Sequence, residues 1–289
     1  MSRLQPTLST PTPRPLRAGL ASSRLLRLIA LPLLRRIDRP ITMTNPFSDL
    51  PFHLLSYTHK GYWFYGRHRE TVTMERLAQM TRRGDTVFEV GGHIGYLTQF
   101  FARQVSHRGQ VHVFEPGQQN QQFLRKNIAR CMQCVHINAA VSDRVGKAVF
   151  YEENLGGFMN SLEADFATST ENARTQGQTL TLHPRSVNTT TLDDYATAHN
   201  VWPDVVKIDC EGTELAVLRG GRQVLQAARC AMIEVSRHKD AVFDMLSGFD
   251  FVLSQPDGTP ITTPKQMNGN VFATRPAPSG SAHPTTDPP

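Results

Sequence analysis

The sequence has no hydrophobic run long enough to cross a membrane as a helix. The apolar stretch between residues 25 and 34 is interrupted by Arg27 and Pro32, whereas a transmembrane helix needs about 20 consecutive apolar residues. The same region lacks a clear A-x-A-like cleavage site, so it is not interpreted as a secretory signal. Together these absences predict a protein without a transmembrane segment that is located in the cytoplasm.

Cysteine is also scarce, with four residues in a chain of 289. Cys131 and Cys134, followed by His136, have the spacing of half a zinc site, but no second Cys/His pair at zinc-site spacing accompanies them. Cys210 and Cys230 lie in apolar, strand-like runs and are expected to be buried thiols. The lack of a second pair argues against a metal centre, and the lack of a secretory signal argues against a disulfide.

Charge is nearly balanced in most of the chain, although the net charge is +6. Residues 1–42 hold eight arginines and one aspartate, a net +7, which leaves −1 for the remainder. The basic character therefore gives no argument for a nucleic-acid partner. The composition of residues 1–42 fits a disordered extension, a stretch ahead of a translation start at Met43, an organelle-directing transit peptide or a segment that touches a membrane surface.

The chain length allows one large domain or two small ones. Composition divides it into a basic, disordered leader (1–48), an aromatic and helical preamble (49–83), a main domain (84–274) and a disordered tail rich in Pro, Ser and Thr (275–289). The sequence says nothing about the oligomeric state.

The preamble (49–83) combines an aromatic patch with a helical pattern. Its aromatic residues are expected either to cover the edge of the core or to form a wall or lid beside an acceptor site: Tyr57, Tyr62, Trp63, Phe64 and Tyr65. Residues 69–82 predict a helix with Val72, Leu77 and Met80 on one face.

The most informative stretch is residues 85–95, DTVFEVGGHIG. A short apolar run typical of a β-strand leads into three glycines within five residues, and a helical pattern follows. A strand, a glycine turn and a helix N-terminus form the nucleotide pocket of many α/β sheets. The glycine order differs from the dinucleotide fingerprint, because Val90 would occupy the first glycine position. Glu89, two residues before the first glycine, instead suits a ligand with a cationic amino-acid end, such as S-adenosyl-L-methionine (SAM).

Acidic residues follow the next two predicted strands. Residues 110–114 predict the second strand, and Glu115 lies 20 residues after the last glycine of the turn, close to where an acidic side chain accepts from two ribose hydroxyls. Capping of the following helix is the alternative role for Glu115. Residues 135–140 predict the third strand, after which Ser142 and Asp143 stand where a bound base would lie. Asp143 is equally suited to a turn.

Residues 204–209 predict a fourth strand that carries three ionisable groups. Lys207, Asp209 and Glu211 alternate along the extended chain and therefore face one side. Such groups on a buried strand are costly unless they pair with one another or take part in function. Their position at the carboxyl end of a strand favours a reaction site over a structural ion-pair network.

The remaining strands follow less distinctive patterns, and they are predicted at residues 147–151, 179–187, 230–235, 249–253 and 270–274. The first two flank a polar segment (152–178), and a loop of this length is often a functional lid that could shape an acceptor site. The strand at 230–235 ends near Glu234 and His238.

With these features in order, the chain resembles the FkbM family of SAM-dependent methyltransferases over about residues 72–272. The resemblance rests on five blocks, of which the last is the most specific: EVGGHIGYLT (89–98), VFEP (113–116), NAAVSD (138–143), TTLDDY (190–195) and KIDCEGTELAVLRGG (207–221). The family usually has Asp at position 89 and Ala-Asn in place of Gly92-His93. The second departure puts an imidazole where an amide stands beside the cofactor.

The resemblance implies a doubly wound, Rossmann-like α/β fold of the class I methyltransferases, with a seven-stranded sheet of order 3-2-1-4-5-7-6 whose strand 7 is antiparallel. It also implies O-methylation of a hydroxyl on a sugar, glycan or other small metabolite, with SAM as the cofactor. The implied site residues are Glu89, Gly91, Gly92, His93 and Gly95 at the methionine end, Glu115 at the ribose, Ser142 and Asp143 at the adenine, and Asp209 and Glu211 at the methyl-transfer site.

Methyl transfer to a hydroxyl needs close alignment and a base that takes the proton. Asp209 is the first candidate base, followed by Glu211, His238 and His93, with Lys207 orienting Asp209 or lowering its pKa.

Three alternative functions remain open at this point. A nicotinamide-dependent oxidoreductase is disfavoured by the glycine order and by the lack of a Tyr-x-x-x-Lys pair. A non-catalytic SAM-binding or interaction module would share the fold. A metal-assisted methyltransferase would use Asp209 and Glu211 as ligands.

Overall fold

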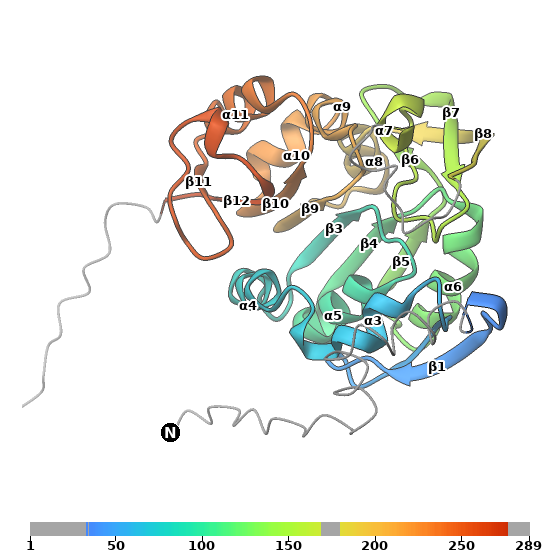
Figure 1. Cartoon of the computed structure of the whole chain (residues 1–289). Helices are drawn as coiled ribbons and strands as arrows, with labels where there is room; N and C mark the ends of the chain where they lie inside the picture. The colour runs from blue at the N-terminus through green and yellow to red at the C-terminus, as the bar shows by residue number, and fades with distance from the viewer. Residues whose placement is uncertain (1–32, 34, 169–179, 277–289) are drawn as a thin grey trace, which may run out of the picture.

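Seven strands form the central sheet of the computed structural model, which describes residues 33, 35–168 and 180–276 (Figure 1). The strands are β3 (Thr86–Val90), β4 (Gln110–Phe114), β5 (Cys134–Ile137), β9 (Val205–Ile208), β10 (Cys230–Val235), β11 (Val252–Ser254) and β12 (Gly269–Thr274). Their order across the sheet is β11-β12-β10-β9-β3-β4-β5. β12 runs antiparallel to both of its neighbours, and the other pairs are parallel. The predicted order and its antiparallel last strand are therefore confirmed.

Helices cover both faces of this sheet because its central strands are apolar on both sides. On one face, Val87, Val111 and Val205 pack against α4 (Thr71–Met80) and α5 (Tyr96–Val105). On the other face, Phe88 and Val206 pack against a second group of helices. That group contains α8 (Leu192–His199), α9 (Glu214–Arg219), α10 (Arg222–Ala227) and α11 (Lys239–Ser247). Further helical elements of this domain are α6 (Gln118–Ile128) and the 3₁₀ turns η2 (Ser106–Arg108) and η3 (Pro264–Gln266).

The N-terminal segments are part of the folded body. β1 (Pro40–Thr44) and β2 (Pro51–Leu55) pair antiparallel, and α3 (Lys60–Tyr65) and η1 (Gly66–His68) follow. Asn45, within the expected leader, is fully buried and donates to the carbonyl of Tyr96 and to Gln99 of α5. The leader boundary at residue 48 was therefore placed too late, because β1 pairs with β2 and Asn45 and Ser48 are buried. Residues 1–32 and 34 lie outside the described part.

A second, smaller sheet projects from the main one. β6 (Ala140–Val141), β8 (Leu182–Thr190) and β7 (Gly146–Glu153) form it in that order. The prediction of one strand at 135–140 was wrong, because the chain leaves the main sheet after Ile137 and re-pairs with β8 at Ala140. The two extra strands are confirmed, and α7 (Ala164–Thr168) lies between them. Residues 169–179, which include the predicted strand start, lie outside the described part.

Two smaller expectations differ from the structure. Val72 is 49% exposed, and α4 instead buries Thr73 and Met74 beside the expected Leu77 and Met80. The C-terminal boundary lies beyond residue 274, because the Arg275 guanidinium donates to four backbone carbonyls. Residues 277–289 are not described. None of the helices in the described ranges combines the length and apolar character that a membrane crossing requires.

Candidate functional site

A cavity of about 460 Å³ opens at the carboxyl ends of the central strands. Most of the residues that the sequence singled out line it: Glu89, Gly91, Gly92, His93, Glu115, Lys207, Asp209 and Glu211. The strand ends meet here because β9, β3 and β4 are neighbouring parallel strands. The cavity is within the size range of small-molecule sites.

The glycine turn is held in a shape that only glycine allows. Gly91 has φ +79°, and a Cβ atom there would lie 1.8 Å from the carbonyl oxygen of Asp209. A Cβ on Gly92 would lie 2.1 Å from a methyl of Val113. Gly95 has φ +87° and begins α5. The turn is thus pressed against the ends of both adjacent strands, which brings the backbone close to anything bound in the cavity.

Within the described part of the chain, Glu89 is a buried carboxyl group with one unpartnered oxygen, an environment that suits a cationic ligand. Its side chain is 1% exposed, and Oε2 has no hydrogen-bond partner among the described residues. Burial raises the pKa of Glu89 to about 7, although the Lys207 charge opposes the increase. The Tyr96 hydroxyl, also buried and lining the cavity, likewise has no partner in the described part of the chain. Buried polar atoms of this kind call for a polar ligand, and the amino group of SAM fits.

Glu115 contacts both the glycine turn and the residue before α6. Oε2 accepts from the backbone N–H of His93 at 2.8 Å, and Oε1 accepts from Gly117, the residue before α6, at 2.8 Å. Burial raises the pKa of Glu115 to about 7 despite these donors. Because a carboxylate oxygen can accept two hydrogen bonds, Oε2 keeps capacity for a ribose hydroxyl in the cavity.

His93 lines the cavity, but both nitrogens of its ring are engaged by other protein groups. Its Nε2 lies 2.8 Å from the carbonyl of Gly156, and Nδ1 lies 3.0 Å from the Tyr62 hydroxyl. A carbonyl only accepts, so Nε2 carries the proton and Nδ1 accepts from Tyr62. Burial lowers the pKa of His93 to about 3. The imidazole is therefore neutral with both nitrogens engaged, which argues against His93 as a base.

The expected adenine contacts lie outside the cavity lining. From that segment, the residues that line it are Ala139, Ala140 and Val141. Ser142 is buried and donates to Asp143 at 3.4 Å, and Asp143 pairs with Arg144. The chain turns toward the smaller sheet at this point, which carries both side chains past the lining residues. Their adenine role remains a prediction.

A buried lysine, Lys207, pairs with the partly exposed Asp209 at the centre of the site. The Lys207 ammonium is 2% exposed, lies 3.2 Å from Asp209 Oδ2 and donates to the carbonyl of Gly91 at 2.7 Å. Burial raises the pKa of Asp209, but Lys207 and a hydrogen bond from Glu234 outweigh burial and lower it overall. Asp209 is therefore ionised at neutral pH.

Glu234 is a site residue that the sequence analysis did not select. One carboxylate oxygen from each of Asp209, Glu211 and Glu234 lies within 4.8 Å of the others. The Asp209 charge, together with burial, raises the pKa of Glu234 to about 9. Met232 pairs with Lys207 across the two strands, so the position two residues later falls beside Asp209. An acidic residue at the end of the neighbouring apolar strand was the signal that could have identified it.

Glu211 belongs to this cluster, but its backbone no longer continues the extended conformation of β9. β9 ends at Ile208, and Glu211 has φ +48°, so the alternation assumed for residues 207–211 stops before its last member. Burial and then the Asp209 charge raise the pKa of Glu211 to about 8. At neutral pH the cluster therefore has one ionised carboxylate, that of Asp209, beside two that mostly retain their protons.

His238 does not join the site. It precedes α11 with φ +54°, is exposed, and is not among the cavity lining residues. The left-handed turn at this residue directs the chain into the helix, away from the strand end. Cys230 is buried as expected, whereas Cys210 is only half-buried and lines the cavity. Tyr62, from the aromatic preamble, is buried and lines the cavity too, so it both covers the core and forms a wall.

The chain was compared with families and individual proteins. The model of the methyltransferase FkbM domain matches residues 89–255. The 2-O-methyltransferase NoeI of Sinorhizobium fredii is 25% identical over 204 residues, which cover 66% of this chain and 81% of that protein.

Solved structures show more distant likeness. Aeropyrum pernix fibrillarin with bound S-adenosyl-L-methionine is 10% identical with a TM-score of 0.40, and the match covers 81% of this chain and 89% of that one. A SAM-dependent O-methyltransferase of Thermotoga maritima is 9% identical with a TM-score of 0.38, and the match covers 73% and 67%. The family model spans more than half of the chain, so this protein belongs to the FkbM methyltransferase family.

Proposed function

We propose that this protein is a SAM-dependent O-methyltransferase that acts on a hydroxyl of a sugar, glycan or other small metabolite. One observation carries the proposal: a single cavity holds a buried carboxylate with an unpartnered oxygen, Glu89, and an ionised carboxylate, Asp209, at adjacent strand ends. The first suits the ammonium of an amino-acid ligand, and the second suits proton removal from an acceptor. The NoeI name supports oxygen as the methylated atom.

The cofactor assignment follows the layout of the cavity. Glu89 and the turn from Gly91 to Gly95 hold the methionine end, and Glu115 receives the ribose hydroxyls. The adenine is assigned to Ser142 and Asp143 from the sequence pattern alone, because these two residues lie beyond the lining residues Ala139 to Val141. When bound, SAM supplies a methyl group on a sulfonium, which an aligned nucleophile can accept by displacement.

Asp209 is the base in this proposal. Lys207 keeps its carboxylate ionised and oriented through the contact at 3.2 Å. A carboxylate is a weak base for a free hydroxyl, but the proton becomes strongly acidic as the new C–O bond forms. Asp209 therefore accepts the proton as the methyl group transfers, without first generating an alkoxide.

Glu211 and Glu234 act as proton-bearing neighbours. Glu234, with a pKa raised to about 9, donates to Asp209 and fixes one of its oxygens. Glu211, with a pKa raised to about 8, is mostly protonated at neutral pH and can donate to a second acceptor oxygen. Both roles suit an uncharged polyhydroxyl acceptor, and a nucleic-acid acceptor is not part of the proposal.

The proposal is tested in two steps. Calorimetry with SAM and with NAD(H) separates the methyltransferase from the oxidoreductase. Wild type is then incubated with SAM and a panel of glycans, lipids and small hydroxyl metabolites, with mass spectrometry detecting the methyl group gained. Asp209→Asn should bind SAM normally and lose turnover. SAM binding without transfer to any acceptor would favour the non-catalytic module, and normal turnover by Asp209→Asn would remove Asp209 as the base.

A second candidate is methyl transfer assisted by a divalent cation. The proximity of Asp209, Glu211 and Glu234 favours it, because oxygen ligands grouped within 4.8 Å suit Mg²⁺ or Mn²⁺. Turnover that EDTA abolishes and Mg²⁺ restores would support this mechanism, and turnover insensitive to EDTA would exclude it.

A further inference from the structure

One wall of the cavity is a segment that follows β7 and ends in α7. We name residues 156–166 the strap. Four of its residues line the cavity: Gly157, Phe158, Asn160 and Leu162. The strap therefore runs along the cavity from the glycine turn to the Glu211 side. Its middle pairs with β7, where Ser161 forms a backbone bridge with Tyr151. Glu153 of β7 also bonds to Phe158 and Asn160. Two further attachments hold its ends.

The first attachment joins the strap to the glycine turn. The His93 ring donates to the carbonyl of Gly156 at 2.8 Å and stacks on Phe158 with ring centroids 4.3 Å apart. Asn120 donates to the carbonyl of Gly157 at 3.2 Å. These contacts come from residues next to the cofactor carboxylates, so they secure the end of the strap nearest the cofactor.

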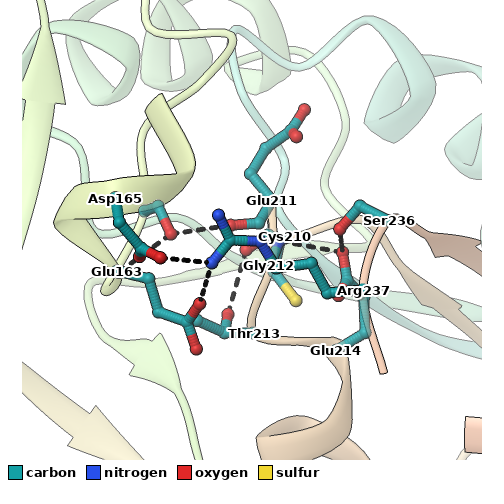
Figure 2. Close-up of polar contacts among 10 residues, drawn as sticks. Glu163, Asp165, Cys210, Glu211, Gly212, Thr213, Glu214, Ser236 and Arg237 are labelled. Carbon is teal, nitrogen blue, oxygen red and sulfur yellow. Dashed lines mark hydrogen bonds and ion pairs between the residues drawn. The ribbon is translucent and has the colours of Figure 1, made fainter. Parts of the chain in front are cut away.

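The second attachment is a single arginine from the turn between β10 and α11 (Figure 2). Arg237 reaches the strap, where its guanidinium lies 2.9 Å from Glu163 Oε2 and 3.0 Å from Asp165 Oδ2. The same guanidinium lies 5.2 Å from the centroid of the Phe166 ring. Its side chain is 26% exposed and is not part of the cavity lining.

This end of the strap is also in contact with the Glu211 turn. The Ser161 hydroxyl donates to the backbone carbonyl of Glu211 at 2.6 Å. Phe166 is buried against Gly212, where an added Cβ would lie 2.7 Å from the ring. Glu211 and Gly212 both have positive φ, so the turn holds a conformation that its neighbours must support.

We propose that Arg237 is a positioning residue for methyl transfer, which holds the strap against the Glu211 turn and so fixes the acceptor wall of the cavity. The inference rests on the proposed function for the identity of the reaction. Arg237 acts through Glu163, Asp165 and Phe166 and touches neither acceptor nor cofactor. Because the cofactor end of the strap has its own attachment at His93 and Asn120, loss of Arg237 should affect the acceptor far more than SAM.

Side-chain exposure is 26% for Arg237, 36% for Glu163 and 77% for Asp165, so the ion pairs are individually weak and their loss should not unfold the protein. Loss of Arg237 should instead increase the mobility of the strap, which forms one wall of the cavity. We expect Arg237→Ala to raise the acceptor KM about tenfold while the Kd of SAM changes by less than about twofold. Arg237→Lys keeps the charge but cannot bridge two carboxylates in a planar fork, and it should recover part of the loss.

The test uses full-length wild type, Arg237→Ala, Arg237→Lys, Glu163→Gln and the double variant of Arg237→Ala with Glu163→Gln. Arg108→Ala, at an exposed position of η2, is the matched control. Hydrogen exchange measured by mass spectrometry reports on peptides that cover the strap and the Glu211 turn. Calorimetry gives the Kd of SAM, and initial rates give kcat and KM with an acceptor found in the panel.

The proposal predicts that the backbone amides of both peptides exchange about tenfold faster in Arg237→Ala than in wild type. Exchange in the control Arg108→Ala should equal that of wild type. The double variant should exchange no faster than Arg237→Ala alone. Unchanged exchange in Arg237→Ala would overturn the proposal, as would SAM affinity that falls as much as acceptor affinity. Failure of SAM to bind, or of any acceptor to be methylated, would refute the proposed function instead. The exchange comparison would still decide whether Arg237 holds the strap.

Discussion

Replacement of Lys207 by methionine should test the electrostatic centre of the site. Methionine has similar length and no charge, so it fills the space but removes three contacts of the ammonium. These join Lys207 to the carbonyls of Val90 and Gly91 at 3.4 and 2.7 Å and to Asp209 at 3.2 Å. Removing one partner of a buried pair costs about 3–5 kcal/mol. Because Asp209 is 30% exposed, we expect the lower limit, about 3 kcal/mol.

That loss corresponds to a decrease in Tm of about 6–12 °C for a domain of this size. In wild type, Asp209 has a lowered pKa, so its contribution to stability is present above its ordinary pKa of 3.8 and is lost as pH falls through the folded value. Lys207 has a raised pKa, so its contribution is present below 10.5 and is lost as pH rises through the folded value.

The variant should therefore show an altered pH dependence as well as a lower Tm. Without Lys207, burial and the neighbouring carboxylates raise the pKa of Asp209, and the folded state binds the proton more tightly than the unfolded state does. The stability difference from wild type should be largest near about pH 7–9 and should shrink toward about pH 4. Turnover should fall near neutral pH and recover in part at higher pH, as Asp209 loses its proton.

Thermal denaturation and urea unfolding across this pH range measure the first effect, and pH–rate profiles measure the second. Lys265→Met, at an exposed position in η3, is the matched control and should match wild type in both. Equal stability of Lys207→Met and wild type at neutral pH, or an unshifted pH–rate profile, would refute the reasoning.

Three further predictions concern the cofactor side. Gly91→Ala should destabilise the protein by about 3 kcal/mol or more, because a Cβ would lie 1.8 Å from a carbonyl oxygen at φ +79°; a urea midpoint equal to wild type would contradict this. His93→Asn should weaken SAM binding about tenfold in calorimetry, because asparagine is too short to reach the Gly156 carbonyl, and wild-type affinity would show that this attachment is dispensable. SAM affinity should rise between about pH 6 and 8 as Glu89, with a pKa near 7, becomes ionised, and this slope should vanish in Glu89→Gln; a slope retained in the variant would assign it to another group.

The sheet could be predicted from sequence because its signals are local. The strands near Glu89, Glu115 and Asp209 are short apolar runs followed by turn residues, and parallel pairing then requires helices on both faces. The chirality of these connections leaves few alternative orders. The predicted strand order is therefore reproduced, and the carboxyl ends bring the acidic residues into one cavity.

What could not be predicted depends on contacts between distant segments. Glu234 becomes a site residue only through its register beside Asp209. Tyr62 was one of five aromatic residues considered for a cavity wall, and its contact with the glycine turn depends on how the preamble packs. The ring of His93 was expected at the cofactor, but it pairs with groups 31 and 63 residues away. His238 was wrongly predicted as a site residue. It follows a strand end closely in the sequence, but it does not line the cavity.

The hydrogen bond from Lys207 to the carbonyl of Gly91 joins positions 116 residues apart in the chain. The smaller sheet and the strap lie between these positions in sequence. Recombination between family members with a single crossover in this interval would pair a glycine turn from one parent with a lysine and aspartate from another. Exchange of the whole interval between β5 and β9 would leave the pair in its parental context. If the strap forms the acceptor wall as proposed, acceptor preference should be transferred between family members by exchanging this internal segment, with both halves of the main sheet taken from one parent.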